Sequence, residues 1–218
     1  MSGFGALRRW LGGEAPAAPT RWVVIDVESS GLDIERDHLL AIGAVALQLQ
    51  GDAPPHIALG DSFELVLRHE AVVADKPNIL LHGIGVGAQR LGLDPVQALQ
   101  AFEQWLGDAP LLAFHSAFDE GMIGRAMRQH LGRKPGNPWV DLAAVAPVLL
   151  PRVRAHSLDD WMAHFGIVCA ARHQAVADAL ATAELLLKLW PALRVQSRDC
   201  SFRALQAVAA QRRWLQPS

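Results

Sequence analysis

Cysteine is scarce in this sequence. Only Cys169 and Cys200 occur in 218 residues, and no Cys-x-x-Cys pair is present. Two cysteines cannot form the disulfide framework of a small secreted domain, and the chain lacks the usual signature of a structural zinc site. The cysteine content favours a reducing compartment, and we expect a cytoplasmic protein.

Excess positive charge and long apolar runs are also missing. The chain has 20 Lys and Arg against 22 Asp and Glu, so bulk charge would not hold a nucleic acid, and any such contact must be local or metal-mediated. No run approaches the roughly 18 apolar residues of a membrane span. Arg8 and Arg9 interrupt the segment where a signal peptide needs an apolar core. We expect neither secretion nor a membrane partner.

The remaining composition is that of an ordinary globular protein. Hydrophobic residues make up 51% of the chain and charged residues 19%, which suits one sizeable core. We divide the chain into an N-terminal tail and linker (1–20), a main domain (21–192) and a C-terminal helical extension (193–218). The apolar residues of 4–11 have helical spacing, which fits a tail packed on its own domain or a docking peptide for a partner.

The apolar pattern predicts an α/β fold. The first three expected strands are joined by loops too short for a crossover helix, which favours antiparallel pairing, and helices then alternate with short strands. This order predicts a mixed five-stranded sheet, an antiparallel meander of three strands plus parallel strands, with helices on both faces. We expect strands at 21–27, 38–50, 62–68, 110–116 and 139–142, the last leading into a helix that runs to Leu150. Further helices are expected at 94–107, 117–132, 157–166, 175–190 (ended by Pro191) and 197–215.

Two carboxylates stand at the end of the first strand. Asp26 and Glu28 are two residues apart, so their side chains share a face of the strand about 7 Å apart. Unpaired carboxylates on a covered sheet face are costly, and a divalent cation removes that cost. Oxygen ligands of this kind suit Mg²⁺ or Mn²⁺ rather than zinc. The alternative is that the strand ends there and both acids are solvated.

Two further positions strengthen the metal-site interpretation. Asp119 follows a buried strand at the start of a helix, a junction where α/β proteins bind ligands. Asp178 interrupts the apolar stripe of a long helix, and His173 lies five residues before it. Asp119 alone would also suit an ordinary helix N-terminus, where the helix dipole favours an acid. Together the sites supply four carboxylates and one histidine at the edges of apolar elements.

These residues carry a resemblance to a known family. "DVESSGL", "HSAFD" and the His-x4-Asp of "HQAVADA" resemble, in order, the three motifs of the DEDDh 3′→5′ exonucleases, over about residues 21–190. "LHGI" (81–84) resembles a stretch common between the first two motifs. Within the family, "DVESSGLD" is most similar to the epsilon proofreading subunit of bacterial DNA polymerase III, a replication protein.

The resemblance implies a ribonuclease H-like fold and the release of nucleoside 5′-monophosphates from a 3′ end. The implied metal ligands of two Mg²⁺, with Mn²⁺ able to substitute, are Asp26, Glu28, Asp119 and Asp178, and His173 is the implied general base. The sequence departs from the family where Ser29-Ser30 replaces Thr-Thr, Ser116 replaces Asn and Ala41 replaces Glu. These departures put substrate contacts in doubt more than chemistry.

We expect the terminal nucleotide at the segment after Glu28. Gly31 permits close approach and Leu32 can wedge against the last base, with Ser29 and Ser30 beside them. His82 and His115 are further candidates for the substrate site. Three arginines are candidates to guide phosphates, with a solvated surface as the alternative: Arg152, Arg154 and Arg172.

Substrate and partners stay open at the level of sequence. Single-stranded DNA is the first choice, and an RNA-trimming enzyme like ribonuclease T or oligoribonuclease is the alternative, because both sugars carry the same phosphodiester. A non-catalytic scaffold of a polymerase is a second alternative. "QRRWL" (211–215) faintly resembles a sliding-clamp-binding peptide but also suits an amphipathic terminal helix. The expected partners are therefore a polymerase catalytic subunit, a sliding clamp or a second copy of the chain.

Overall fold

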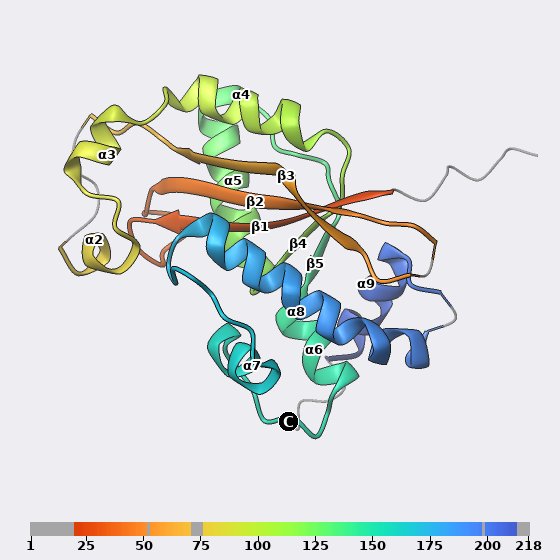
Figure 1. Ribbon diagram of the computed structural model, residues 1–218. Coiled ribbons are helices and arrows are strands. Elements are labelled where there is room, and N and C mark those ends of the chain that lie inside the picture. The colour runs from red at the N-terminus through yellow and green to blue at the C-terminus, as the bar shows by residue number, and fades with distance from the viewer. Residues whose placement is uncertain (1–19, 52, 71–75, 198, 213–218) are drawn as a thin grey trace, which may run out of the picture.

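A mixed five-stranded sheet forms the centre of the protein, seen in a computed structural model that describes residues 20–51, 53–70, 76–197 and 199–212 (Figure 1). The strand order is β3-β2-β1-β4-β5. The first three strands pair antiparallel, whereas β4 is parallel to β1 and β5 is parallel to β4. The expected mixed sheet is confirmed. The strands are β1 (Arg21–Ser29), β2 (Leu39–Gln48), β3 (His56–Val66), β4 (Leu111–Ala113) and β5 (Trp139–Asp141).

The central strand β1 divides the interior into two cores. Its side chains alternate between the faces of the sheet, because successive residues of a strand point to opposite sides. Trp22 and Val24 belong to one buried cluster, and Val23 and Ile25 belong to the other. Asp26 continues the Trp22 and Val24 face, so the alternation that buries the core also aims this carboxylate.

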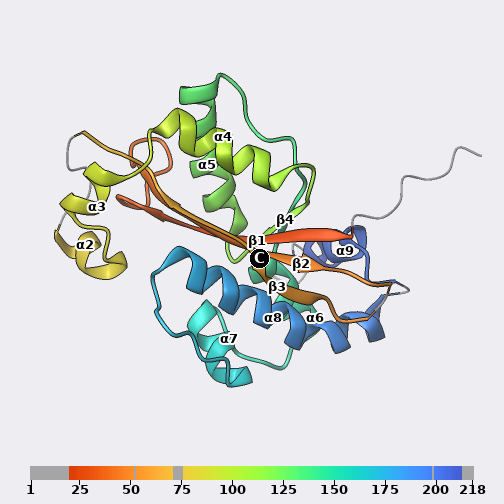
Figure 2. The same cartoon turned by 45° about the horizontal axis from the view of Figure 1, so that its top comes forward.

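Helices cover both faces of the sheet, as expected (Figure 2). Two of them, α4 (Pro95–Leu106) and α5 (Ser116–Leu131), pack on the Val23 face. The opposite face is covered by α6 (Leu142–Leu149), α7 (Leu158–Phe165), α8 (Ala175–Gln196) and α9 (Phe202–Gln211). Two short helices, α2 (Lys76–His82) and α3 (Val86–Leu91), lie beside one end of the sheet and were not expected.

Several expected boundaries were wrong, and the start of β3 and the end of α8 each differ by six residues. Strand β3 begins at His56, six residues before the expected start, and its pairing with β2 shifts register between Val45 and Ala46. Helix α8 does not end at Pro191 but continues to Gln196. Proline lacks the N–H of one helical hydrogen bond, but the fully buried Trp190 and Leu193 on either side keep this last stretch packed on the core.

The described part of the C-terminal extension packs into the same core as the sheet. Phe202, Leu205 and Val208 of α9 are buried, and the Phe202 ring meets Trp22 edge-on at 5.4 Å between ring centroids. Residues 1–19 and 213–218, with the expected tail helix and most of "QRRWL", lie outside the described residues. None of the helices in the described ranges combines the length and apolar character that crossing a bilayer requires.

Candidate active site

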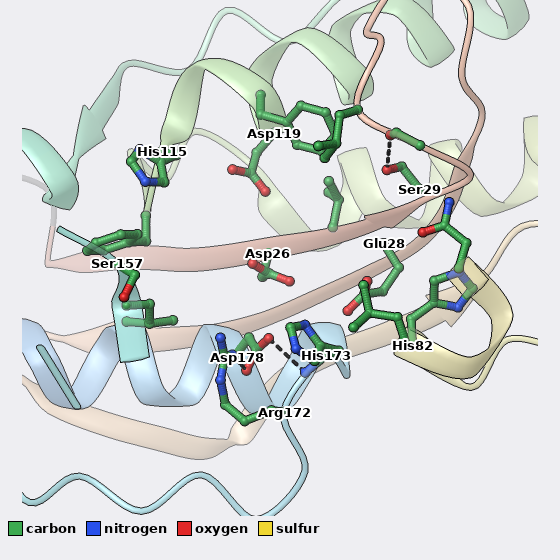
Figure 3. Close-up of a pocket in the computed structure, with 18 of the residues that line it drawn as sticks. Asp26, Glu28, Ser29, His82, His115, Asp119, Ser157, Arg172, His173 and Asp178 are labelled. Atoms are coloured by element: carbon green, nitrogen blue, oxygen red, sulfur yellow. Dashed lines mark hydrogen bonds and ion pairs between the residues drawn. The ribbon is translucent and has the colours of Figure 1, made fainter. Parts of the chain in front are cut away.

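A pocket of about 500 Å³ opens where β1 and β4 end. Its walls come from β1 and the loop after it, from α2, and from the first residues of α5 and α7 (Figure 3). The segment just before α8, with His173, completes the lining. Elements far apart in sequence therefore converge at the carboxyl end of the central strand, the edge at which α/β sheets bind ligands.

Four carboxylates meet in this pocket. Asp26, Glu28 and Asp178 each place a carboxylate oxygen within 4.8 Å of the others. Asp119 lines the same pocket from α5, and Figure 3 shows Asp26 between Asp119 on one side and Asp178 on the other. Asp119 and Asp178 are 4% and 5% exposed, so these acids are held in the protein rather than on a solvated rim. Asp26 and Glu28 are half-buried beside them, which disfavours the alternative in which the strand-end acids are simply solvated.

A glycine allows α8 to place Asp178 close to the strand that carries Asp26. Gly43 on β2 is the register partner of Asp26. A Cβ atom on Gly43 would lie 2.7 Å from the Cβ of Ala175, the first residue of α8, and closer still to the backbone there. The absence of a side chain therefore lets α8 begin directly against β2. Sequence reasoning missed this role, although a glycine inside a strand is itself a signal of close approach.

Burial and mutual repulsion make the carboxylates hard to ionise. Burial is the main cause that raises the pKa of Asp26 well above its usual range, followed by the charges of Asp119, Glu28 and Asp178. Burial and then the charge of Asp178 raise the pKa of Glu28 to about 8. Burial raises the pKa of Asp119 too, and the backbone amides of Asp119 and Val27 oppose that shift. Such a group of acids is stabilised by a bound cation.

The described residues fit a divalent metal. The donors are carboxylate oxygens, which Mg²⁺ and Mn²⁺ prefer, and at least three of them converge within one ion's reach. Burial raises the pKa values of Asp26 and Asp119, and neighbouring carboxylates add to it, so a bound cation would favour the ionised forms. Metal binding to these oxygens would displace protons and remove the repulsion.

Arg172 supplies the positive charge nearest to Asp178. Its guanidinium donates to Asp178 Oδ1, and its Nε donates to Asp159 Oδ1 at 2.7 Å, which links the segment before α8 to the start of α7. The two carboxylates raise the pKa of Arg172 further above its usual range, although burial opposes this. Arg172 is thus the one expected phosphate guide that lines the pocket, whereas Arg152 and Arg154 are exposed on the loop before α7.

Two histidines that line the pocket adopt left-handed backbone conformations. His115 has φ 67° and His173 has φ 62°. Non-glycine residues adopt this conformation uncommonly, and such strain persists only where surrounding contacts enforce it. The backbone N–H of His173 donates to Asp178 Oδ2 at 3.0 Å, and that of His115 donates to Asp141 Oδ1 at 2.9 Å. A carboxylate thus fixes each turn.

A third histidine presents a free ring nitrogen to the pocket. His82, at the end of α2, is 5% exposed, and its Nδ1 accepts a hydrogen bond from the Ile84 N–H at 3.0 Å. Burial and then the charge of His173 lower the pKa of His82, so the ring is neutral and its Nε2 carries the proton. Within the described residues this Nε2 has no hydrogen-bond partner.

The expected substrate residues divide into two groups. Ser29, Gly31 and Leu32 line the pocket, as do His82 and His115. Ser30 points elsewhere: its hydroxyl donates to Asp37 Oδ1 at 3.1 Å and accepts from the His38 N–H at 2.8 Å. Phe118 and Leu81 also line the pocket; they stand inside "HSAFD" and "LHGI" but were not singled out as substrate residues. The remaining lining residues outside the quoted motifs were not singled out for the pocket either: Asn78, Phe114, Ser157, Leu158 and Asp159.

The family model described as Exonuclease (RNase T) matches residues 23–186, most of the chain and all four carboxylates. The chain belongs to this exonuclease family. The chain is 30% identical to the "DNA polymerase III PolC-type" of Oceanobacillus iheyensis over 176 residues, which cover 77% of the present chain and 11% of that polymerase. The exonuclease-family chain thus spans about a ninth of the length of this relative.

Solved structures resemble this exonuclease-family chain over most of its length. Escherichia coli exonuclease I in complex with a dT13 oligonucleotide matches with a TM-score of 0.70 at 15% identity, covering 82% of the present chain and 42% of that one. Cell-death related nuclease 4 matches with a TM-score of 0.69 at 14% identity, covering 83% and 66%. The expected ribonuclease H-like fold and family membership are confirmed.

Proposed function

We propose that this protein is a metal-dependent 3′→5′ exonuclease that releases nucleoside 5′-monophosphates from single-stranded DNA. The observation that carries the proposal is the convergence of four carboxylates and His173 in one pocket at the carboxyl end of β1. Family membership supports the reaction class. We assign the activity to residues 21–192, with 1–20 and 193–218 as flanking segments.

Asp26, Glu28, Asp119 and Asp178 would hold two Mg²⁺ ions, or Mn²⁺ in their place. When bound, such ions supply Lewis-acid stabilisation of the phosphate charge and lower the pKa of a water. The protein's part is to fix the oxygen ligands: β1 sets Asp26 and Glu28 on one face, while α5 and α8 bring their carboxylates from either side. Because these elements are anchored in two cores, the ligand geometry is built in before substrate arrives.

His173 would take the proton from the attacking water. Histidine is suited to this step because its ordinary pKa lies near neutral pH. The chain contains no tyrosine, so no phenol competes for the role. The left-handed turn at His173, tied to Asp178 through the backbone, keeps the imidazole at the pocket while its segment remains outside any helix. His82 would donate its Nε2 proton to the nucleotide.

The apolar side of the pocket would receive the terminal base. Leu32 and Leu81 line it with 87% and 53% of their surface exposed, and Phe118 adds an aromatic face from α5. Exposed apolar side chains at a pocket mouth suit stacking against any base. Such contacts are tolerant of sequence, as exonucleolytic removal of successive nucleotides requires. Gly31 beside them would let the sugar approach the backbone.

DNA is the favoured substrate, and a polymerase is the favoured partner. The support is that one relative is a DNA polymerase and one structural neighbour was solved with a dT13 oligonucleotide. RNA trimming remains the alternative, separated by comparing rates on matched single-stranded DNA, RNA and dinucleotides. We infer action in DNA replication in the cytoplasm; a sliding clamp and a second copy of the chain are the other proposed partners, tested by pulldown and size-exclusion chromatography.

The decisive experiment replaces Asp178. Asp178→Ala should abolish release of mononucleotides from a 5′-labelled oligonucleotide, because it removes a ligand oxygen, while circular dichroism keeps the wild-type helix content. EDTA should abolish wild-type release, and added Mg²⁺ or Mn²⁺ should restore it. Purified Asp178→Ala protein with wild-type activity would overturn the assignment, and release of mononucleotides by the wild type would exclude the non-catalytic scaffold.

A further inference from the structure

The loop 30–38, which follows β1 and carries Gly31 and Leu32, is closed on itself. The Ser30 N–H donates to the His38 carbonyl at 2.9 Å, and the His38 N–H donates to Ser30 Oγ at 2.8 Å. This pair of bonds joins the two ends of the loop. Its tip is therefore a defined turn at the pocket wall, although Leu32 itself is exposed.

Asp37 fills the inside of the loop. Its carboxylate accepts from the Ser30 hydroxyl at 3.1 Å and from the Asp33 N–H at 2.8 Å. A Cβ atom on Gly31 would lie 2.7 Å from Asp37 Cγ, so any larger residue there would force the Asp37 carboxylate to move. Gly31 thus leaves room for Asp37 inside the loop as well as for a ligand at the pocket.

Arg125 of α5 ties the loop to the main structure. Its Nη1 donates to the Ile34 carbonyl at 2.7 Å and to the Asp37 carbonyl at 2.5 Å. Arg125 is half-buried, and it forms no ion pair with a carboxylate in the described part of the chain. A charged donor that serves two backbone carbonyls contributes more than a neutral one. The guanidinium is therefore committed to the loop backbone.

A second contact with α5 determines how closely the loop 30–38 packs on this helix. Gly121 lies one turn before Arg125 and under Ile34: a Cβ atom there would lie 2.9 Å from both Ile34 Cδ1 and Ile34 Cγ2. Ile34 is partly buried against the core that α5 helps to form. The loop is thus held on α5 by two contacts: the Ile34 side chain packs on Gly121, and Arg125 donates hydrogen bonds to the loop backbone.

The helix that holds the loop also carries Asp119. Arg125 stands six residues after Asp119, which is about 9 Å along the helix axis. Both belong to one continuous helix, α5, whose inner face is buried. The position of Leu32 relative to the carboxylate cluster is therefore fixed through α5.

We propose that Arg125 is a positioning residue for the 3′-terminal nucleotide. By holding the loop 30–38 on α5, it keeps Gly31 and Leu32 at the separation from Asp119 that a nucleotide needs when its phosphate reaches the carboxylates. Arg125 itself touches neither substrate nor reacting atoms. This inference rests on the proposed function, because it assigns the loop to the terminal nucleotide.

The first test compares Arg125→Ala with Arg128→Ala. Arg128 is exposed on the next turn of the same helix and serves as the matched control. With a single-stranded oligonucleotide carrying 2-aminopurine at its 3′ end, we expect Arg125→Ala to raise KM about tenfold and to change kcat less than about threefold, because the loss falls on substrate binding. Arg128→Ala should behave as wild type. Arg125→Lys should recover part of the KM, since an ammonium can still donate to the carbonyls.

The second test uses two glycines of α5 and keeps the proposal falsifiable if Arg125→Ala fails to fold. Gly121→Ala should displace Ile34 and raise KM several-fold without lowering Tm, because alanine favours a helix over glycine and this gain offsets the local shift. Gly124→Ala is the control: its Cβ would meet only Arg128 Nη1, at an ordinary 3.5 Å. Gly124→Ala should therefore leave KM unchanged.

The outcomes separate this inference from the proposed function. Wild-type KM in both Arg125→Ala and Gly121→Ala, with Asp178→Ala inactive, would overturn the positioning role alone. A kcat loss without a KM change would also overturn it, because that result would place Arg125 in the chemistry. An active Asp178→Ala protein would instead overturn the function on which the inference depends.

Discussion

The two sides of the pocket are built differently. The side that holds Asp26 and Asp178 consists of β1, its neighbour β2 and the long helix α8, which meets β2 at Gly43. The side that holds Leu32 and Leu81 consists of a loop and a seven-residue helix, with both leucines exposed. The proposed chemistry, which needs fixed geometry, would thus use buried groups of the scaffold. The proposed base contacts would come from exposed side chains, and we call this side adjustable because such side chains change rotamer readily although α5 holds the loop backbone.

The largest effect is expected from a substitution that disturbs the packing of the rigid side. Gly43→Ala should push α8 away from β2 and reduce kcat about a hundredfold or more, since a shift of about 1 Å in a catalytic group has effects of that order. Stability should fall as well, because overpacking a core typically costs about 1–3 kcal/mol. Activity assays with thermal melts check both expectations.

Gly60→Ala is the matched control for Gly43→Ala. Gly60 is also a strand glycine, but a Cβ atom there would meet nothing within 4 Å. Equal losses of activity in Gly43→Ala and Gly60→Ala would show that a strand glycine is needed for the backbone conformation of the sheet rather than for the close approach of α8. Wild-type activity in Gly43→Ala would contradict the rigid-scaffold account directly.

The adjustable side should respond to substitution in KM rather than in stability. Leu32→Ala should raise KM for single-stranded DNA about five- to tenfold, because base stacking is worth about 1–3 kcal/mol. Tm should stay at the wild-type value, since Leu32 is 87% exposed. Leu59→Ala, at an exposed leucine of β3 outside the pocket, is the control. A fall in kcat with unchanged KM would place Leu32 in the chemistry instead.

The smallest expected effect is a pH dependence confined to the rigid side. Burial raises the pKa of Glu28 to about 8 in the folded protein, above its value in the unfolded chain. When the pKa of a group is higher in the folded protein than in the unfolded chain, protonation of that group stabilises the fold. This stabilisation is complete at pH values below the pKa in the unfolded chain, and it is lost as the pH rises through the pKa in the folded protein. The free energy of unfolding of the metal-free protein should therefore fall as pH rises from about 5 to about 8.

Urea unfolding with EDTA or with Mg²⁺ measures this dependence. Added Mg²⁺ should flatten the decline, because a cation takes over the role of the protons. Glu28→Gln removes the titrating group and should reduce the slope without metal. A metal-free stability that is flat or rises over this range would show that the carboxylates ionise without cost.

The sequence alone located the rigid side more fully than the adjustable side. Asp26, Glu28, Asp119 and Asp178 were expected at the ends of strands and helices, because a carboxylate stands out in an apolar pattern. The five-stranded sheet followed from the same patterns. The two short helices, α2 and α3, were missed, since six or seven residues hold too little of a helical period to be recognised.

Other features were missed because they depend on contacts across the fold. Gly43 and Gly121 leave room for Ala175 and Ile34 respectively, and each of these partners is distant from its glycine in the sequence. Arg125 carries no sequence signal of its role, because the Ile34 and Asp37 carbonyls that its guanidinium meets lie 91 and 88 residues before it. Pro191 was expected to end α8 because local propensity cannot register the burial of Trp190 and Leu193.

The hydrogen bond from the His173 backbone to Asp178 has a consequence for how this pocket can vary. One carboxylate serves both as a proposed ligand and as the anchor of the turn that carries the proposed base. The dependence runs one way, because the donor is the His173 backbone: a change at Asp178 would remove a proposed ligand and release the turn together, whereas a change of the His173 side chain would leave the hydrogen bond in place. Asp178 is therefore the single residue through which the proposed metal site and the position of the proposed base are coupled.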